Sequence, residues 1–231
     1  MQTPEQSANA LMAPSGKRNN STMSRLLPLF PLQLVVFPGS AVPLHIFEER
    51  YREMVGEAEA AATEFGIVLA KDEGIVNVGC AVTVEAVLHR YPDGRFDVMT
   101  RGQRRFTIAS LDREKAYLRG EVEYFEDDEW TPVTPELRER AMKAFGQMKE
   151  AAGGQTPADT PDPEHPLLSF QLAQAVDDLG FKAALQRIRS EAERLRRFAD
   201  FMENYIPMRQ YAAKMKRAAP TNGSGHKPAS L

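Results

Sequence analysis

Hydrophobic residues follow two different periods along the chain, and each period predicts one type of element. Between residues 48 and 62 they recur at the i, i+3, i+4 and i+7 spacing of a helix face, at Tyr51, Met54, Val55 and Ala58. Elsewhere in the first half, short apolar or alternating runs predict strands at 26–30, 41–46, 65–70, 78–90, 95–100, 103–109 and 117–125. We interpret Arg101-Gly102 as a turn between two of these strands.

A helical period dominates from Thr134 onward. Thr134-Pro135-Glu136 has the composition of a helix start, because Thr caps free backbone N–H groups and Pro is tolerated in the first turn. Further helices are predicted within 167–188 and from 190 to 206, with Pro207 kinking or ending the last one. The pattern favours the α+β class: a pseudo-β-barrel with one early helix, followed by a C-terminal α-helical subdomain.

Composition divides the chain into four segments. Residues 1–25 and 218–231 are polar and lack an apolar period, so we expect disordered tails that cannot offset the entropy of ordering. The barrel-like subdomain is expected at 26–130 and the helical subdomain at 131–217, with a Pro-rich loop at 155–166. No apolar run is long enough to cross a membrane, and the single Cys80 fits a reducing cytoplasm.

Charge is distributed unevenly. Residues 26–130 hold 19 acidic and 11 basic residues, whereas residues 181–231 hold 4 acidic and 11 basic ones. The two halves therefore attract each other, or the helical half presents a basic face to an acidic partner. The candidates for such a face are Arg194, Arg196 and Arg197, which we place on the solvent side of an amphipathic helix.

Motifs for nucleotide binding, nucleophilic catalysis and metal binding are absent. The sequence contains no P-loop, no dinucleotide-binding glycine pattern, no G-x-S-x-G and no H-E-x-x-H. The four histidines lack the spacing of metal ligands, and Cys80 alternates with apolar residues as a buried, inert thiol would. We therefore expect no catalytic residue, no cofactor and no metal.

Several ordered strings carry a family resemblance. They are Leu27-Pro28-Leu29, Val35-Val36-Phe37-Pro38-Gly39, Val42-Pro43-Leu44-His45-Ile46-Phe47-Glu48, Tyr91-Pro92-Asp93-Gly94 and Arg101-Gly102-Gln103-Arg104-Arg105-Phe106. Over about residues 26–206 the chain resembles the N-terminal domain of Lon proteases. The resemblance implies a barrel of the PUA-like type plus helices, and recognition of unfolded or tagged protein. It also implies a stand-alone domain, because the chain has room for neither the ATPase nor the Ser–Lys protease module.

Candidate binding residues lie in the apolar run from Leu29 to Phe37. If Phe30, Leu32, Val35 and Phe37 are exposed, they form a patch suited to apolar polypeptide. The alternative, that these four side chains fill the barrel, stays open. We predict a non-catalytic module that binds unfolded polypeptide or a protein partner, with an adaptor as one form of this role. The alternative function is RNA binding, by analogy with PUA-like barrels, although the acidic barrel half would repel phosphates.

Overall fold

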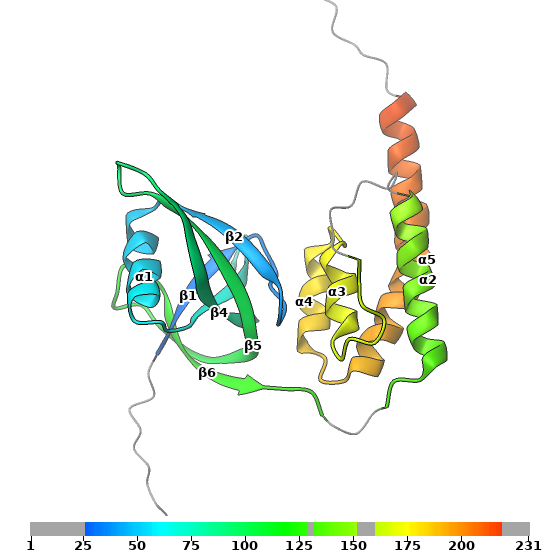
Figure 1. Cartoon of the computed structure of the whole chain (residues 1–231), viewed down its shortest axis with the longest axis horizontal. Coiled ribbons are helices and arrows are strands. Elements are labelled where there is room, and N and C mark those ends of the chain that lie inside the picture. The colour runs from blue at the N-terminus through cyan, green and yellow to red at the C-terminus, as the bar shows by residue number, and fades with distance from the viewer. Residues whose placement is uncertain (1–25, 129–131, 152–159, 219–231) are drawn as a thin grey trace, which may run out of the picture.

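Six β-strands form one mixed sheet that closes on itself (Figure 1). The structure is a computed structural model, and it describes residues 26–128, 132–151 and 160–218. The strands are β1 (Leu27–Leu32), β2 (Ala41–Ile46), β3 (Phe65–Lys71), β4 (Gly74–Arg90), β5 (Phe96–Asp112) and β6 (Arg119–Phe125). Their order is β2-β5-β4-β3-β1-β6, and β6 pairs again with β5. Strands β1, β3, β4, β5 and β6 thus make a closed ring. A sheet with separate helices before and after its later strands confirms the predicted α+β class.

Strands β4 and β5 are each 17 residues long and form one bent hairpin whose register shifts at three bulges. The predicted turn at Arg101-Gly102 is wrong, because β5 is continuous through both residues. Gly102 has another role: the loop at residues 37–40 crosses the strand there, and the Gly102 N–H donates to the carbonyl of Ser40 at 2.9 Å. A Cβ atom at Gly102 would overlap the carbonyl oxygen of Phe37.

Helix α1 (Glu49–Ala60) closes one side of the barrel with the face that the sequence predicts. Its buried residues are Tyr51, Met54, Val55 and Ala58. They pack in one hydrophobic cluster with barrel residues such as Phe65, Ile67 and Val98. The i, i+3, i+4, i+7 pattern therefore identified both the helix and its packing face.

Four helices follow the sheet: α2 (Pro135–Ala151), α3 (Leu168–Gln174), α4 (Leu179–Arg187) and α5 (Glu191–Ala218). Helix α2 starts as predicted, with the Leu137 N–H donating to the Thr134 hydroxyl at 3.3 Å. Helices α2, α3 and α5 share a second hydrophobic cluster that includes Phe145, Leu172 and Phe198. Residues 129–131, where the predicted subdomain boundary falls, lie outside the described residues, as do both predicted tails apart from residue 218 and residues 155–159 of the Pro-rich loop.

Helix α5 runs for 28 residues and continues through Pro207, so of the two predicted alternatives, a kink or an end, the end at Pro207 is wrong. Pro207 and Glu203 are both exposed. Water can therefore satisfy the carbonyl that loses its helical donor to the proline. Within the described part of the chain, no helix combines the length and the apolar character that crossing a membrane requires.

The helical half is joined to the barrel through helices α3 and α4. Phe37 of the barrel stacks on Phe170 of α3 with ring centroids 4.7 Å apart. Val78 of β4 and Leu185 of α4 belong to the same hydrophobic cluster. Gln186 adds a hydrogen bond of 2.8 Å from its side-chain amide to the carbonyl of Val36. Apolar packing and a hydrogen bond therefore hold the junction together.

A buried ionic network reinforces this junction, and its centre is Arg194. The side chain of Arg194 is fully buried, so its predicted place on the solvent side of α5 is wrong. Its guanidinium donates to both carboxylate oxygens of Asp127, at 2.6 and 2.5 Å, and to Glu191 at 2.7 Å. A further bond reaches the Ser169 hydroxyl at 2.9 Å, and Arg105 of β5 binds the same Asp127. Arg194 thus serves the fold, since two carboxylates compensate its charge inside the protein.

Candidate functional site

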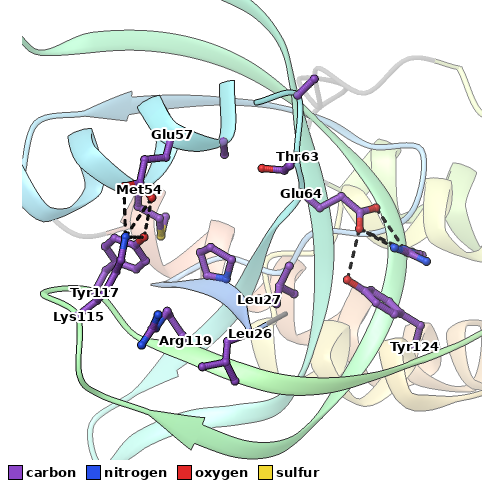
Figure 2. Close-up of a pocket in the computed structure, with 14 residues that line it drawn as sticks. Leu26, Leu27, Met54, Glu57, Thr63, Glu64, Lys115, Tyr117, Arg119 and Tyr124 are labelled. Atoms are coloured by element: carbon purple, nitrogen blue, oxygen red, sulfur yellow. Dashed lines mark hydrogen bonds and ion pairs between the residues drawn. The ribbon is translucent and has the colours of Figure 1, made fainter. Parts of the chain in front are cut away.

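A large hollow lies on the barrel, between α1, the start of β1 and β6 (Figure 2). We call it the α1–β6 groove, and its volume is about 770 Å³. The elements that line it are far apart in the chain but adjacent in the closed sheet. The lining residues are Leu26, Leu27, Pro28, Met54, Glu57, Ala58, Ala62, Thr63, Glu64, Arg104, Lys115, Tyr117, Arg119 and Tyr124.

The floor of the groove is apolar. Leu26, Leu27 and Pro28 contribute aliphatic surface from the strand that enters the barrel, and Met54 and Ala58 contribute the buried face of α1. Figure 2 shows Leu26 and Leu27 between two hydrogen-bonded clusters that stand at the two ends of the groove. An apolar floor with a few fixed polar groups is typical of a ligand-binding site.

The first cluster joins Glu57, Lys115 and Tyr117. The Lys115 ammonium donates to the Tyr117 hydroxyl at 2.8 Å and to a Glu57 oxygen at 3.2 Å, and the Tyr117 hydroxyl donates to Glu57 at 2.9 Å. These hydrogen bonds, first from Tyr117 and then from Lys115, lower the pKa of Glu57. Hydrogen bonds to Tyr117 and Glu57 raise the pKa of Lys115. Both groups are therefore held in their charged forms.

The second cluster joins Glu64, Arg104 and Tyr124. Arg104 donates from two nitrogens to the Glu64 carboxylate, with the shortest N–O distance at 2.8 Å. The Tyr124 hydroxyl reaches the same carboxylate at 3.3 Å, and the guanidinium of Arg104 lies 3.7 Å from the centre of the Tyr124 ring. This stacking fixes the orientation of an aromatic side chain that is 39% exposed. Tyr124 is thus a preorganised aromatic surface at one end of the groove.

The polar rim is electrically balanced. Besides the two clusters, Arg119 pairs with Asp112 at 2.6 Å, so each of the three cations that line the groove already has a carboxylate partner. General acid–base catalysis near neutral pH needs a carboxyl whose pKa is raised or an amine whose pKa is lowered, and Glu57 and Lys115 are shifted in the opposite directions. The groove therefore combines an apolar floor with a rim of ion-paired side chains.

Cys80 lies away from the groove, in β4, and is fully buried. Burial raises the pKa of its thiol to about 12, which leaves the thiolate unpopulated at neutral pH. Among the described residues, no group of three or more His, Cys, Asp or Glu side chains is arranged to hold a metal ion.

Three of the four apolar candidates from the sequence lie in the core. Phe30, Val35 and Phe37 are 6%, 7% and 1% exposed, so they do not form a surface patch. Phe30 packs against Tyr51 and Phe65, while Phe37 packs against the helical half. The alternative that these side chains fill the barrel holds for Phe30, whereas Val35 and Phe37 are buried in the cluster between the barrel and the helical half. Leu32 is half-buried against the barrel core and does not line the groove.

Of the three arginine candidates, one is buried and two are exposed. Arg194 belongs to the buried junction network, whereas Arg196 and Arg197 are exposed on α5. Both exposed side chains pair with Glu193, at 2.8 and 3.0 Å. Their charge is therefore partly compensated within one turn of the helix, and the structure does not bring them near the α1–β6 groove.

Sequence reasoning missed the residues that line the groove. Glu57 and Tyr117 are 60 positions apart, and so are Glu64 and Tyr124. No local spacing links such pairs, because they meet only when β6 closes the ring beside β1. The one local signal of the groove was the short spacing of Lys115 and Tyr117, which lie two residues apart near the start of a predicted strand.

Comparison with known proteins identifies the family. The family model described as the ATP-dependent protease La (LON) substrate-binding domain matches residues 26–211. The chain belongs to this family. Relatives of this LON substrate-binding domain include the Lon protease of Flavobacterium johnsoniae, 25% identical over 142 residues, and Lon protease 2 of Myxococcus xanthus, 27% identical over 124 residues. The matches cover 54% and 50% of this chain but only 17% and 15% of the relatives, so the chain spans a small part of their length.

Solved structures show the same fold. The Lon N-terminal domain protein from Xanthomonas campestris has 26% sequence identity and a TM-score of 0.61, and the match covers 77% of this chain and 99% of that one. The N-terminal domain of the Mycobacterium avium complex Lon protease has 19% identity and a TM-score of 0.58, with 78% and 100% covered. The LON substrate-binding domain described here therefore has the same fold as the N-terminal domains of these Lon proteins.

Proposed function

We propose that this LON domain is a non-catalytic module that binds an unfolded or extended polypeptide segment, supplied by a client or a partner protein, in the α1–β6 groove. The observation that carries the proposal is the groove itself, with a volume of about 770 Å³, an apolar floor and a preorganised polar rim. The family description, a substrate-binding domain of an ATP-dependent protease, supports a protein as the ligand. An adaptor role, presenting bound segments to another protein, is consistent with this activity.

The chemistry of the groove suits a polypeptide. Apolar side chains of an extended segment gain free energy by leaving water for the floor at Leu26, Leu27 and Pro28. Backbone amides and carbonyls of the same segment can pair with the carboxylates and hydroxyls of the rim, whose positions are already fixed by the Glu57–Lys115–Tyr117 bonds. Preorganised partners reduce the entropy lost on binding.

RNA fits this groove less well. A phosphate backbone binds through cations that are free to exchange counterions for phosphates. In the groove, Arg104, Lys115 and Arg119 are each already paired with a carboxylate, which a phosphate would have to displace. The paired rim thus supports a polypeptide over the PUA-like alternative of RNA binding.

The test compares two exposed side chains of the barrel. Tyr124 is 39% exposed and lines the groove, whereas Leu111 is 42% exposed and lies outside it, so Leu111→Ser is a matched control for Tyr124→Ser. Binding to a permanently unfolded, reduced polypeptide is measured by fluorescence anisotropy, after circular dichroism confirms the fold of both variants. We expect Tyr124→Ser to weaken binding by at least about fivefold, since central aromatic contacts contribute more than 1 kcal/mol.

Three outcomes separate the functions. Binding that is weakened by Tyr124→Ser, left unchanged by Leu111→Ser and retained at moderate salt supports the proposal, because apolar burial is insensitive to screening. Equal binding by both variants removes the groove from consideration. Tight binding of single-stranded RNA that falls steeply with salt would establish the RNA alternative instead.

A further inference from the structure

A second hollow lies where the helical half meets the barrel, between the start of β4 and helix α4. We call it the junction groove, and its volume is about 420 Å³. Ile75 and Val76 of β4 and Ala183 and Ala184 of α4 contribute its apolar surface. Figure 1 shows α4 on the side of the helical half that faces the barrel.

The charges of the junction groove differ from those of the α1–β6 groove. Two cationic residues, Lys71 and Arg187, line it, and no carboxylate does. The neighbouring acids Asp72 and Glu73 are exposed in the turn between β3 and β4 and are not part of the lining. The α1–β6 groove contains carboxylates in its lining, and so do two smaller hollows of the described residues, through Glu123 and Glu203.

Arg187 is held in place across the junction. Its guanidinium donates to the side-chain oxygen of Asn77 on β4, and no ion pair with a carboxylate is present for Arg187 among the described residues. The hydrogen bond to a neutral amide orients the guanidinium without neutralising it. A guanidinium in this state is a ready partner for an incoming carboxylate, which it can bind with two parallel hydrogen bonds.

The two grooves are connected by shared lining residues. Between them lies a smaller hollow of about 340 Å³, which shares Tyr124 with the α1–β6 groove and shares Asn77 and Arg187 with the junction groove. The three hollows are therefore neighbours on the surface, and a segment that leaves the α1–β6 groove past Tyr124 enters the hollow that Arg187 also lines. A polypeptide is the kind of ligand that can follow such a path, because it is long and flexible.

Building on the polypeptide-binding function above, we propose that the junction groove is a second subsite for the same extended segment and that Arg187 selects an acidic side chain within it. The preferred segment then has an apolar or aromatic residue in the α1–β6 groove and an Asp or Glu further along. Lys71 at the other side of the junction groove strengthens the same preference.

The experiment uses two peptides that differ only in charge. Both carry apolar residues and blocked termini, and the Glu residues of one are replaced by Gln in the other, so that no terminal carboxylate competes. Anisotropy titrations with the whole chain should show binding of the Glu peptide about three- to fivefold tighter than binding of the Gln peptide, as expected for one partly exposed ion pair. The difference should shrink at high salt.

Two substitutions test the assignment to Arg187. Arg187→Gln removes the cation, and Asn77→Asp gives Arg187 a carboxylate partner within the protein. Each should remove most of the preference for Glu over Gln, because neither variant has a guanidinium at position 187 that is free to pair with the peptide. The matched control is Arg196→Gln, which removes the same charge from an exposed site on α5 and should keep the preference.

The outcomes distinguish this proposal from the function on which it rests. If the wild-type chain binds both peptides equally, or if Arg187→Gln keeps the preference, the assignment is overturned while polypeptide binding stands. If the wild-type chain binds neither peptide nor an unfolded protein, the proposed function fails as well. Displacement of the Glu peptide by a single-stranded RNA, lost in Arg187→Gln, would show that the subsite serves phosphates and would also overturn the proposal.

Discussion

Replacing Arg194 with Met probes the buried network that joins the two halves. In the native protein all five N–H donors of the guanidinium are bonded, and the side chain has no exposed surface. Met fills much of the same volume but removes the charge. Asp127 then keeps Arg105 as a partner, whereas Glu191, whose side chain is 9% exposed, loses its cation. The variant therefore creates one buried carboxylate without a counter-charge.

The expected cost follows from these contacts. Breaking a buried ion pair by removing one partner destabilises a protein by about 3–5 kcal/mol. Glu191 retains hydrogen bonds from the N–H and the hydroxyl of Ser169, at 2.7 and 2.6 Å, which replace part of the lost interaction. We therefore expect the lower end, about 3 kcal/mol, which corresponds to a fall in Tm of about 6–12 °C for a domain of this size.

Urea unfolding at pH 7, followed by circular dichroism, measures this difference. The matched control is Arg196→Met, because Arg196 lies two residues away on the same helix, is 48% exposed and pairs with Glu193. An exposed pair contributes about 0–1 kcal/mol, so the control should unfold close to the wild type. If the two variants lose the same small amount of stability, Arg194 is not buried and the junction described here is wrong.

Two further predictions concern the fold. Gly102→Ala should destabilise the protein by about 1–3 kcal/mol in the same urea assay, because the added Cβ overlaps the Phe37 carbonyl; an unchanged midpoint would contradict the crossing of loop and strand. Burial raises the pKa of Asp127, but its bonds with Arg194 and Arg105 more than offset this and lower the pKa below its ordinary value. A carboxyl whose folded pKa is depressed stabilises the protein above its unfolded pKa, at about 4, and loses this contribution as the pH falls through the folded pKa. Unfolding free energies from pH 7 to 3 should therefore decline below about pH 4, and less steeply in Asp127→Asn; equal slopes would contradict the pairing.

The sequence was sufficient to predict an element and its buried face where the spacing of apolar residues determines both. The apolar positions of α1 recur at helical spacing, so they identified the helix and its buried face together. Arg194 shows the limit of residue type as a guide. It lies four positions before Phe198, on the inner face of α5, although we predicted it on the solvent side of the helix together with Arg196 and Arg197. Compensation by Asp127, 67 residues away, was not visible in the sequence.

Other features depend on contacts that the sequence does not encode locally. A glycine in a turn and a glycine under a crossing backbone look the same in a sequence, and Gly102 is the second kind. Phe30 and Phe37 are apolar whether they form a patch or fill a core, so only the fold could separate the two alternatives. The α1–β6 groove exists because β6 closes the sheet against β1, and the residues of its two polar clusters come from segments far apart in the chain.

Hydrogen exchange with and without a permanently unfolded polypeptide tests the central claim most directly. If the segment binds in the α1–β6 groove, amide exchange should slow in α1 and the turn that follows it, residues 54–64, and in residues 115–124. Residues on the far part of α5, from 208 to 215, should exchange at the same rate in both states. Protection confined to α5, or no protection at saturating polypeptide, would contradict the account.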